Sequence, residues 1–264
     1  MLVVGGGGAG CRASIEAHDQ GASVLMILKG ELGQSGCTLN VGTSAAVGPW
    51  GLPEDNNFQS MNDLLEYGGF LGNQELAKIL IDESPESVKE LQNWGIDFAR
   101  DTDGSITIGH SAAHTYPRNF FFNTKSPRDH EYGLPPGIAI MDTLVGQMEK
   151  RNIRVLENVM LVDLLKKDGH CVGAIGLNTV ENKFIAFEAT STVLATGSYS
   201  RVFSHTSVSP HETGDGHAAA FRAGATLMDM ENSQFVASSI GTPPGSKLLN
   251  VNGEEFLEKY GIKG

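Results

Sequence analysis

The sequence predicts an α/β fold in which a parallel central sheet is joined to a smaller antiparallel β unit. Three observations predict it. Residues 2–28 run as strand, glycine turn, helix and strand, which is a βαβ unit. The second of these strands, residues 24–28, is a continuous apolar run typical of a buried parallel strand. Residues 154–189 then hold several short alternating segments separated by turns, as antiparallel strands do.

The remaining elements follow from hydrophobic spacing and from glycine and proline. Apolar residues at helical spacing predict helices over four further segments, and the alternating segments predict four strands of the antiparallel unit. The predicted helices are residues 58–68, 73–94, 138–150 and 213–223. The predicted antiparallel strands are residues 154–156, 160–166, 171–178 and 184–189, and residues 192–195 form a further apolar strand.

Composition limits the partners that the chain can have. Its 264 residues are 40% hydrophobic, which is enough for one substantial core. The 31 acidic and 19 basic residues give a formal charge of −12. Such a surface does not favour binding to nucleic-acid phosphates or to an anionic membrane, so we expect no nucleic-acid partner.

Cysteine usage and hydropathy narrow the class of protein further. Cys11, Cys37 and Cys171 lie far apart without C-x-x-C spacing, so the sequence predicts no disulfide framework and no cysteine-rich metal site. An iron–sulfur cluster would therefore belong to a partner chain. No apolar run reaches the ~20 residues that cross a bilayer. No basic signal-peptide start follows Met1, so we expect a cytoplasmic protein without a transmembrane segment.

The turn at residues 5–10 matches G-x-G-x-x-G in the context that makes this pattern informative, after a strand and before a helix. The first glycine makes the turn, the second lets pyrophosphate oxygens approach, and the third allows tight packing of helix on strand. The helix N-terminus offers free N–H groups to phosphate. The alternative is a tight βα connection that binds no ligand. The predicted contact residues here are Gly5, Gly7, Gly8, Ala9 and Gly10.

The residue that would bind an adenosine ribose is missing from its usual place. The standard pattern has a carboxylate about 20 residues after the glycines, whereas here the strand ends at Leu28 and Lys29. Glu31 is a substitute just beyond the strand. This difference disfavours an NAD-binding protein more than an FAD-binding one.

Three further segments carry a family resemblance. They are the loop with Lys29, Ser35, Gly36, Cys37 and Thr38, the turn Ala195, Thr196 and Gly197, and the T-G-D-G turn that contains Asp215. Together with the glycine turn and the small-residue run 42–46, they resemble the flavoprotein family of succinate dehydrogenase, fumarate reductase and L-aspartate oxidase. The resemblance implies a Rossmann-like FAD-binding domain, with all of these residues near FAD.

The resemblance also bears on how FAD is held. In the membrane-bound members of the family, a histidine before the loop threonine is joined covalently to the flavin. Cys37 occupies that position here. Noncovalent FAD is therefore expected, and Cys37 is interpreted as a small residue packed in a loop rather than as a thioether link.

Histidines elsewhere raise the question of a metal site. His110 and His114 form an H-x-x-x-H pair in a stretch that resembles the family's G-H-S-x-x-R region. A metal would need a third ligand, so we predict loop hydrogen bonding instead, no metal, and Arg118 in contact with the flavin or a substrate carboxylate. The histidines of the later loop and helix are interpreted as surface or capping residues; they are His205, His211 and His217.

The chain departs from the family near its end. Val236 replaces the family's substrate-binding histidine, and Glu255 stands where the family often has arginine. The family's arginine proton shuttle and most of its capping domain would follow Gly264. We therefore expect an FAD-binding domain over residues 1–235 and the beginning of a truncated capping domain over 236–264, with the catalytic residues unknown.

Two classes of function remain open. The resemblance implies an FAD-dependent oxidoreductase that moves a hydride between flavin and a small dicarboxylate, incomplete as this chain. It also implies an iron–sulfur or complementary flavoprotein chain as partner. The alternative is a non-catalytic or vestigial flavin-binding module, or one half of a split enzyme.

Overall fold

In the computed structural model, the described residues are 1–41, 44–45, 52–110, 114–123, 137–233, 247, 249–256 and 259, with only the backbone described at 44–45. The chain divides into two compact units, residues 1–228 and residues 229–264. The predicted domain boundary between residues 235 and 236 lies outside the described residues and stays a prediction.

A four-stranded parallel sheet is the centre of the first unit. Its strand order is β10–β1–β2–β6, formed by Thr192–Leu194, Leu2–Val4, Leu25–Ile27 and Arg154–Leu156. The predicted parallel sheet is confirmed, because β1 pairs in parallel with both β2 and β10.

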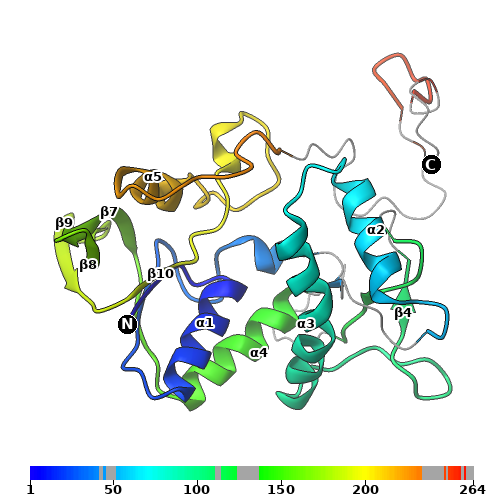
Figure 1. Cartoon of the computed structure of the whole chain (residues 1–264), viewed down its shortest axis with the longest axis horizontal. Coiled ribbons are helices and arrows are strands. Elements are labelled where there is room, and N and C mark those ends of the chain that lie inside the picture. Colours follow the sequence, from blue (N-terminus) through cyan, green and yellow to red (C-terminus); the bar gives the residue numbers. More distant parts are fainter. Residues whose placement is uncertain are drawn as a thin grey trace. The chain divides into compact units, whose positions relative to one another are not determined.

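Helices cover one face of this sheet. Helix α1 spans Gly8–Asp19 and helix α4 spans Gly137–Lys150, and the two lie side by side (Figure 1). Alternate sheet residues point toward them, and a fully buried side chain of this kind contributes about 1.5–3 kcal/mol. The buried cluster on this face consists of Val3, Cys11, Ile15, Val24, Met26, Leu28, Met141, Leu144 and Met148.

An antiparallel sheet covers the other face. Its strands are β7, Val159–Lys167, β8, His170–Asn178, and β9, Lys183–Glu188. Helix α5, Asp215–Arg222, packs on β7 (Figure 1). The buried cluster on this face, to which α5 contributes Ala219, consists of Leu2, Val4, Ile27, Val159, Leu161, Ala174, Phe187 and Ala219. The predicted antiparallel β unit is thus confirmed over three strands.

The prediction that residues 154–156 belong to the antiparallel unit was wrong. Residues 154–156 form β6, which pairs in parallel with β2, with Leu25 opposite Arg154 and Ile27 opposite Leu156. The physical reason is the crossover: α4 lies on the central sheet and delivers the next strand to the same sheet in the same direction. Three residues are too few for alternation to distinguish the two sheets.

The rest of the first unit is a helical excursion with its own small core. Helices α2, Asn57–Tyr67, and α3, Gln74–Asn93, confirm two predicted helices. Asn73 caps α3 by accepting hydrogen bonds from Glu75 N (2.9 Å) and Leu76 N (3.1 Å). The short strands β3, Ser44–Ala45, β4, Ile108–Gly109, and β5, Asn119–Phe120, form a third sheet beside α3. The core here consists of Val88, Ile96, Phe98, Phe120 and Phe122.

Few residues of the second unit are described. Leu249 and Glu255 form an isolated antiparallel bridge, and Glu255 pairs with Lys247. Val236 lies outside the described residues, so the prediction about its substrate contact stays a prediction.

Candidate nucleotide-binding site

A cavity of about 610 Å³ opens in the first unit where β1, β2 and β10 end. Parallel sheets commonly bind ligands at this edge, and the volume is within the usual range of cofactor sites. Every predicted contact residue except Gly10 lines it. These residues are Gly5, Gly7, Gly8, Ala9, Lys29, Ser35, Gly36, Cys37, Thr38, Ala195, Thr196, Gly197 and Asp215.

Glycine is required at different positions of the first turn for different structural reasons. Gly5 has φ +108°, and a Cβ there would lie 2.2 Å from Ala195 O. A Cβ at Gly10 would lie 1.9 Å from Gly5 O, so Gly10 permits helix and strand to pack closely. At Gly7 a Cβ would meet only Thr38 Oγ1, at 3.8 Å, because this position faces the cavity. Gly7 is therefore the position where a ligand gains the most from a missing side chain.

The N-terminus of α1 is suited to bind an anion. No side chain caps the helix at Gly7, and its first turn carries no acidic residue. Gly8 N donates to Thr38 Oγ1 at 3.1 Å, which fixes the loop around residue 38 against the helix end. Gly7, Gly8 and Ala9 line the cavity at this helix end, where the helix dipole favours negative charge.

The first glycine turn and the later Asp-bearing turn converge on this one cavity. Lys29 follows β2, and its Nζ donates to Thr213 Oγ1 at 2.6 Å and to Asp215 Oδ2 at 2.7 Å. This pair links the end of β2 to the start of α5. Glu31, the suggested substitute for the ribose carboxylate, does not line the cavity.

Histidine side chains also reach the cavity, which the sequence did not predict. His211 is exposed yet lies against Gly30, where a Cβ would be 2.7 Å from its ring. His217 lines the cavity from α5, and its Nδ1 is buried without a hydrogen-bond partner among the described residues. Interpreting His217 as a surface or capping residue was therefore wrong. The only sequence signal was its place in the first turn of the helix after T-G-D-G.

Glu212 is another cavity residue that sequence reasoning missed. Its side chain is buried, with 4% of the residue exposed. Burial disfavours the ionised form, but hydrogen bonds from Cys37 and Ser198 outweigh this effect and lower the pKa of Glu212. A carboxylate directly before T-G-D-G was available as a signal, although nothing in the sequence indicated that it turns inward.

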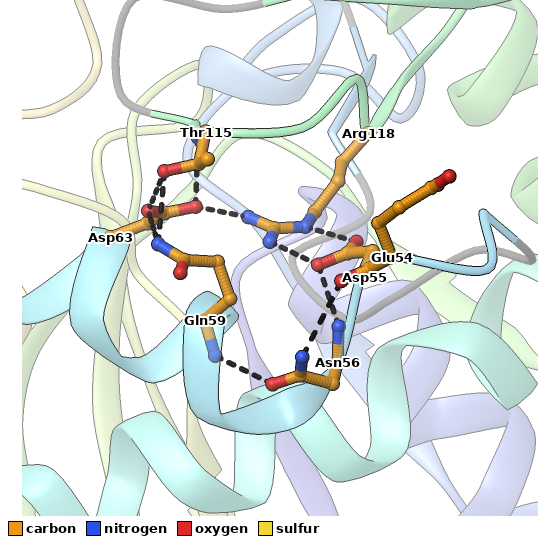
Figure 2. A network of polar contacts seen from close by, with 7 residues as sticks. All are labelled: Glu54, Asp55, Asn56, Gln59, Asp63, Thr115 and Arg118. Carbon is orange, nitrogen blue, oxygen red and sulfur yellow. Dashed lines mark hydrogen bonds and ion pairs between the residues drawn. The ribbon is translucent and has the colours of Figure 1, made fainter.

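Arg118 does not lie at the cavity. It is fully buried, and its guanidinium donates to both Asp55 oxygens, at 2.6 and 2.8 Å, and to Asp63 Oδ2 at 2.7 Å (Figure 2). Thr115 and Gln59 also donate to Asp63. Because its donors are engaged inside the fold, the prediction that Arg118 contacts flavin or a substrate carboxylate is wrong. Arg118 instead joins α2 to the segment that leads into β5.

Fold and site together define an α/β protein of the dinucleotide-binding class, with a glycine turn and a helix N-terminus at the carboxyl edge of a parallel sheet. Comparison with known proteins identifies the family. A model described as FAD binding domain matches residues 1–256. The chain belongs to this FAD-binding family, which includes the flavoprotein subunits of fumarate reductase and succinate dehydrogenase.

Two relatives show how much of the chain the similarity covers. A fumarate reductase (CoM/CoB) subunit of Methanothermobacter marburgensis is 32% identical over 279 residues, which cover 100% of this chain and 49% of that protein. The succinate dehydrogenase flavoprotein subunit of Rickettsia conorii is 31% identical over 283 residues, covering 98% and 45% respectively. The chain thus spans about half the length of these relatives.

Solved structures agree with this assignment. The quinol fumarate reductase of E. coli superposes with a TM-score of 0.83 at 26% identity, covering 100% of this chain and 45% of that one. Mycobacterium smegmatis Sdh1 superposes with a TM-score of 0.74 at 33% identity, covering 84% and 37%. Within the described part of the chain, no helix has the length and apolar character needed to span a membrane.

Proposed function

We propose that this chain binds FAD noncovalently in the cavity at the carboxyl edge of the parallel sheet, with the pyrophosphate at the N-terminus of α1. The observation that carries the proposal is the convergence of three separate segments, residues 5–9, 35–38 and 195–197, on that cavity together with Asp215. A helix N-terminus without an acidic residue in its first turn and the open position at Gly7 fit a diphosphate.

The contacts around Cys37 support noncovalent binding. Burial and a hydrogen bond to Glu212 raise the pKa of the Cys37 thiol to about 11, so the thiol is protonated at neutral pH. Because the thiolate is the nucleophilic form of cysteine, Cys37 is a poor candidate for a covalent bond to flavin.

We further propose that the chain is the FAD-binding part of an oxidoreductase acting on a small dicarboxylate. When bound, FAD supplies hydride transfer, while the residues of this chain bind and orient it. The support is similarity to proteins named fumarate reductase and succinate dehydrogenase. Since these relatives are about twice as long and are named as subunits, an iron–sulfur or complementary flavoprotein chain as partner is part of the proposal. A cytoplasmic location stays a prediction.

The absorption spectrum and cofactor mass of the purified chain test FAD binding. We expect flavin absorption in the folded protein, release of the chromophore on denaturation, and the mass of intact FAD in the released fraction. A folded chain that is colourless and gains no flavin absorption after incubation with FAD would contradict the proposal. Flavin that stays with the denatured chain would contradict noncovalent binding alone.

Fumarate reduction with an artificial electron donor separates an oxidoreductase from a flavin-binding module. The flavin-loaded chain is assayed with reduced methyl viologen and fumarate. Turnover supports the oxidoreductase, whereas bound FAD without turnover favours the non-catalytic alternative for this chain.

A further inference from the structure

Glu212 lies between two loops that form facing parts of the cavity wall. One loop holds Cys37, at the start of the 3-10 helix η1, Cys37–Asn40. The other holds Ser198, after the A-T-G turn, and leads into the short helix η2, Ser200–Val202. All three residues line the cavity.

The Glu212 carboxylate is bonded to the Ser198 loop and lies against the Cys37 loop. Ser198 donates its hydroxyl at 2.6 Å and its backbone N–H at 3.0 Å, both to Oε2. The side chain and the backbone N–H of Cys37 lie close enough to the same carboxylate for both to lower its pKa. Gly197 makes room for it, because a Cβ there would lie 3.1 Å from Glu212 Cδ. Polar groups of two loops therefore meet at one side chain.

The charge of this carboxylate is stabilised by hydrogen bonds rather than by a cation. Among the described residues, no Lys, Arg or His lies within ion-pair distance of Glu212, and only 4% of the residue is exposed. A buried carboxylate in this situation is costly unless its oxygens are well hydrogen-bonded. Loss of the carboxylate or of one of its donors therefore leaves a buried polar group without its hydrogen bond.

We propose that Glu212 is a positioning residue of the FAD site, whose carboxylate fixes the Cys37 loop against the Ser198 loop and engages the Cys37 thiol as a donor. This inference rests on the proposed function, because its effect on the cofactor requires that the cavity holds FAD. The loop that Glu212 fixes is the one whose Thr38 accepts from Gly8 at the N-terminus of α1. Glu212 thus influences the placement of the phosphate-binding turn indirectly, through the contact between Thr38 and Gly8.

The same contact controls the chemistry of the thiol. The negative charge of Glu212 beside Cys37 disfavours the thiolate, so its removal lowers the pH at which Cys37 ionises. The other titratable groups that line the cavity are Lys29, His211, Asp215 and His217. Arg201 is a nearby cation, and its guanidinium donates to the carbonyls of Val208 and Ser209.

Glu212→Gln, with Glu181→Gln as matched control, tests the proposal in the full chain. Glu181 lies exposed in the β8–β9 turn, away from the cavity. FAD affinity is measured by fluorescence titration, and alkylation of Cys37 by iodoacetamide is followed against pH by peptide mass spectrometry in the absence of FAD. We expect E212Q to weaken FAD binding about tenfold and to shift Cys37 alkylation to lower pH. E181Q is expected to change neither.

A folded E212Q variant with the wild-type alkylation profile and wild-type FAD affinity overturns the proposal. If E212Q does not fold, Cys37→Ser and Cys37→Ala decide instead, because serine keeps a donor for Glu212 and alanine does not. The serine variant is expected to bind FAD at least threefold more tightly than the alanine variant, and equal affinities overturn the proposal. A wild-type chain that binds no FAD contradicts the proposed function, while the alkylation profile still tests the Glu212–Cys37 contact.

Discussion

Gly7 and Gly10 belong to one sequence motif but have different roles in the structure. A methyl group at Gly7 would enter the cavity, whereas a methyl group at Gly10 would strike the backbone of Gly5. The motif alone predicts both glycines. The distances assign one of them to ligand access and the other to packing of α1 on β1.

Substituting alanine at Gly7 and at Gly10 tests these two roles separately. Gly7→Ala is expected to keep the free energy of unfolding within about 1 kcal/mol of wild type and to weaken FAD binding at least tenfold, because the methyl group occupies space left for the pyrophosphate. Gly10→Ala is expected to lower the free energy of unfolding by about 3 kcal/mol. Urea unfolding and FAD titration measure the two effects. Wild-type FAD affinity in G7A would argue against a phosphate at this turn.

Asp63 makes the stability of the first unit depend on acid pH. Burial opposes ionisation of Asp63, but hydrogen bonds from Thr115, Gln59 and Arg118 outweigh it and lower its pKa from 3.8 to about 2 (Figure 2). A carboxylate with a lowered folded-state pKa adds stability above its unfolded-state pKa, and that stability is lost as pH falls from about 4 to about 2. The shift corresponds to about 2 kcal/mol.

Asp63→Asn therefore lowers the free energy of unfolding at pH 7, by about 3 kcal/mol, because it leaves part of the buried Arg118 guanidinium unpaired. It also flattens the loss of stability between pH 4 and pH 2. Urea unfolding at several pH values measures both effects. Asp168→Asn, on the exposed β7–β8 turn, is the control. An acid dependence of D63N equal to that of wild type would contradict this role.

At the scale of elements, the sequence predicted most helices and strands because each has a local signal. Apolar spacing predicted α2, α3 and α4, and Gly95, with φ +96°, follows the C-terminal end of α3, where glycine commonly ends a helix. Pairing partners have no such local signal. Strand β6 was placed in the wrong sheet because its neighbour is decided by the crossover through α4.

The candidate site shows the same division between local and long-range information. Residues in glycine turns were predicted because their type and spacing carry the chemistry. Glu212 and His217 were missed, and Arg118 was misplaced, because their roles depend on the direction of a side chain within the fold. Two of these residues turn into the cavity, while Arg118 turns into a buried ion-pair network.

The Lys29–Asp215 pair links two elements that are 186 residues apart and is testable without FAD. Lys29→Met, Asp215→Asn and the double variant form a double-mutant cycle for the free energy of unfolding. The side chains are 25% and 28% exposed, so we expect a coupling energy of about 1 kcal/mol. Strictly additive effects would show that the pair does not hold β2 against α5.

For the first unit as a whole, the central sheet is covered by helices on one face and by the antiparallel sheet on the other, which leaves its carboxyl edge for the cavity. A ligand bound there would contact the glycine turn before α1, the residue 35–38 loop and α5, so binding stabilises the folded unit by mass action. At 100 times its dissociation constant, FAD is expected to add about 2.7 kcal/mol. Thermal unfolding with and without FAD measures this, with FMN, which lacks the diphosphate, as the comparison. Equal stabilisation by FMN would argue against a diphosphate contact.

A crystal structure of the chain grown with FAD is the most direct measurement of where the cofactor lies. We expect the pyrophosphate within hydrogen-bonding distance of backbone N–H groups at the N-terminus of α1, with Asp215 and the residue 35–38 loop in contact with the same FAD molecule. FAD bound elsewhere, or a structure in which these segments do not share one ligand, would contradict the proposed site.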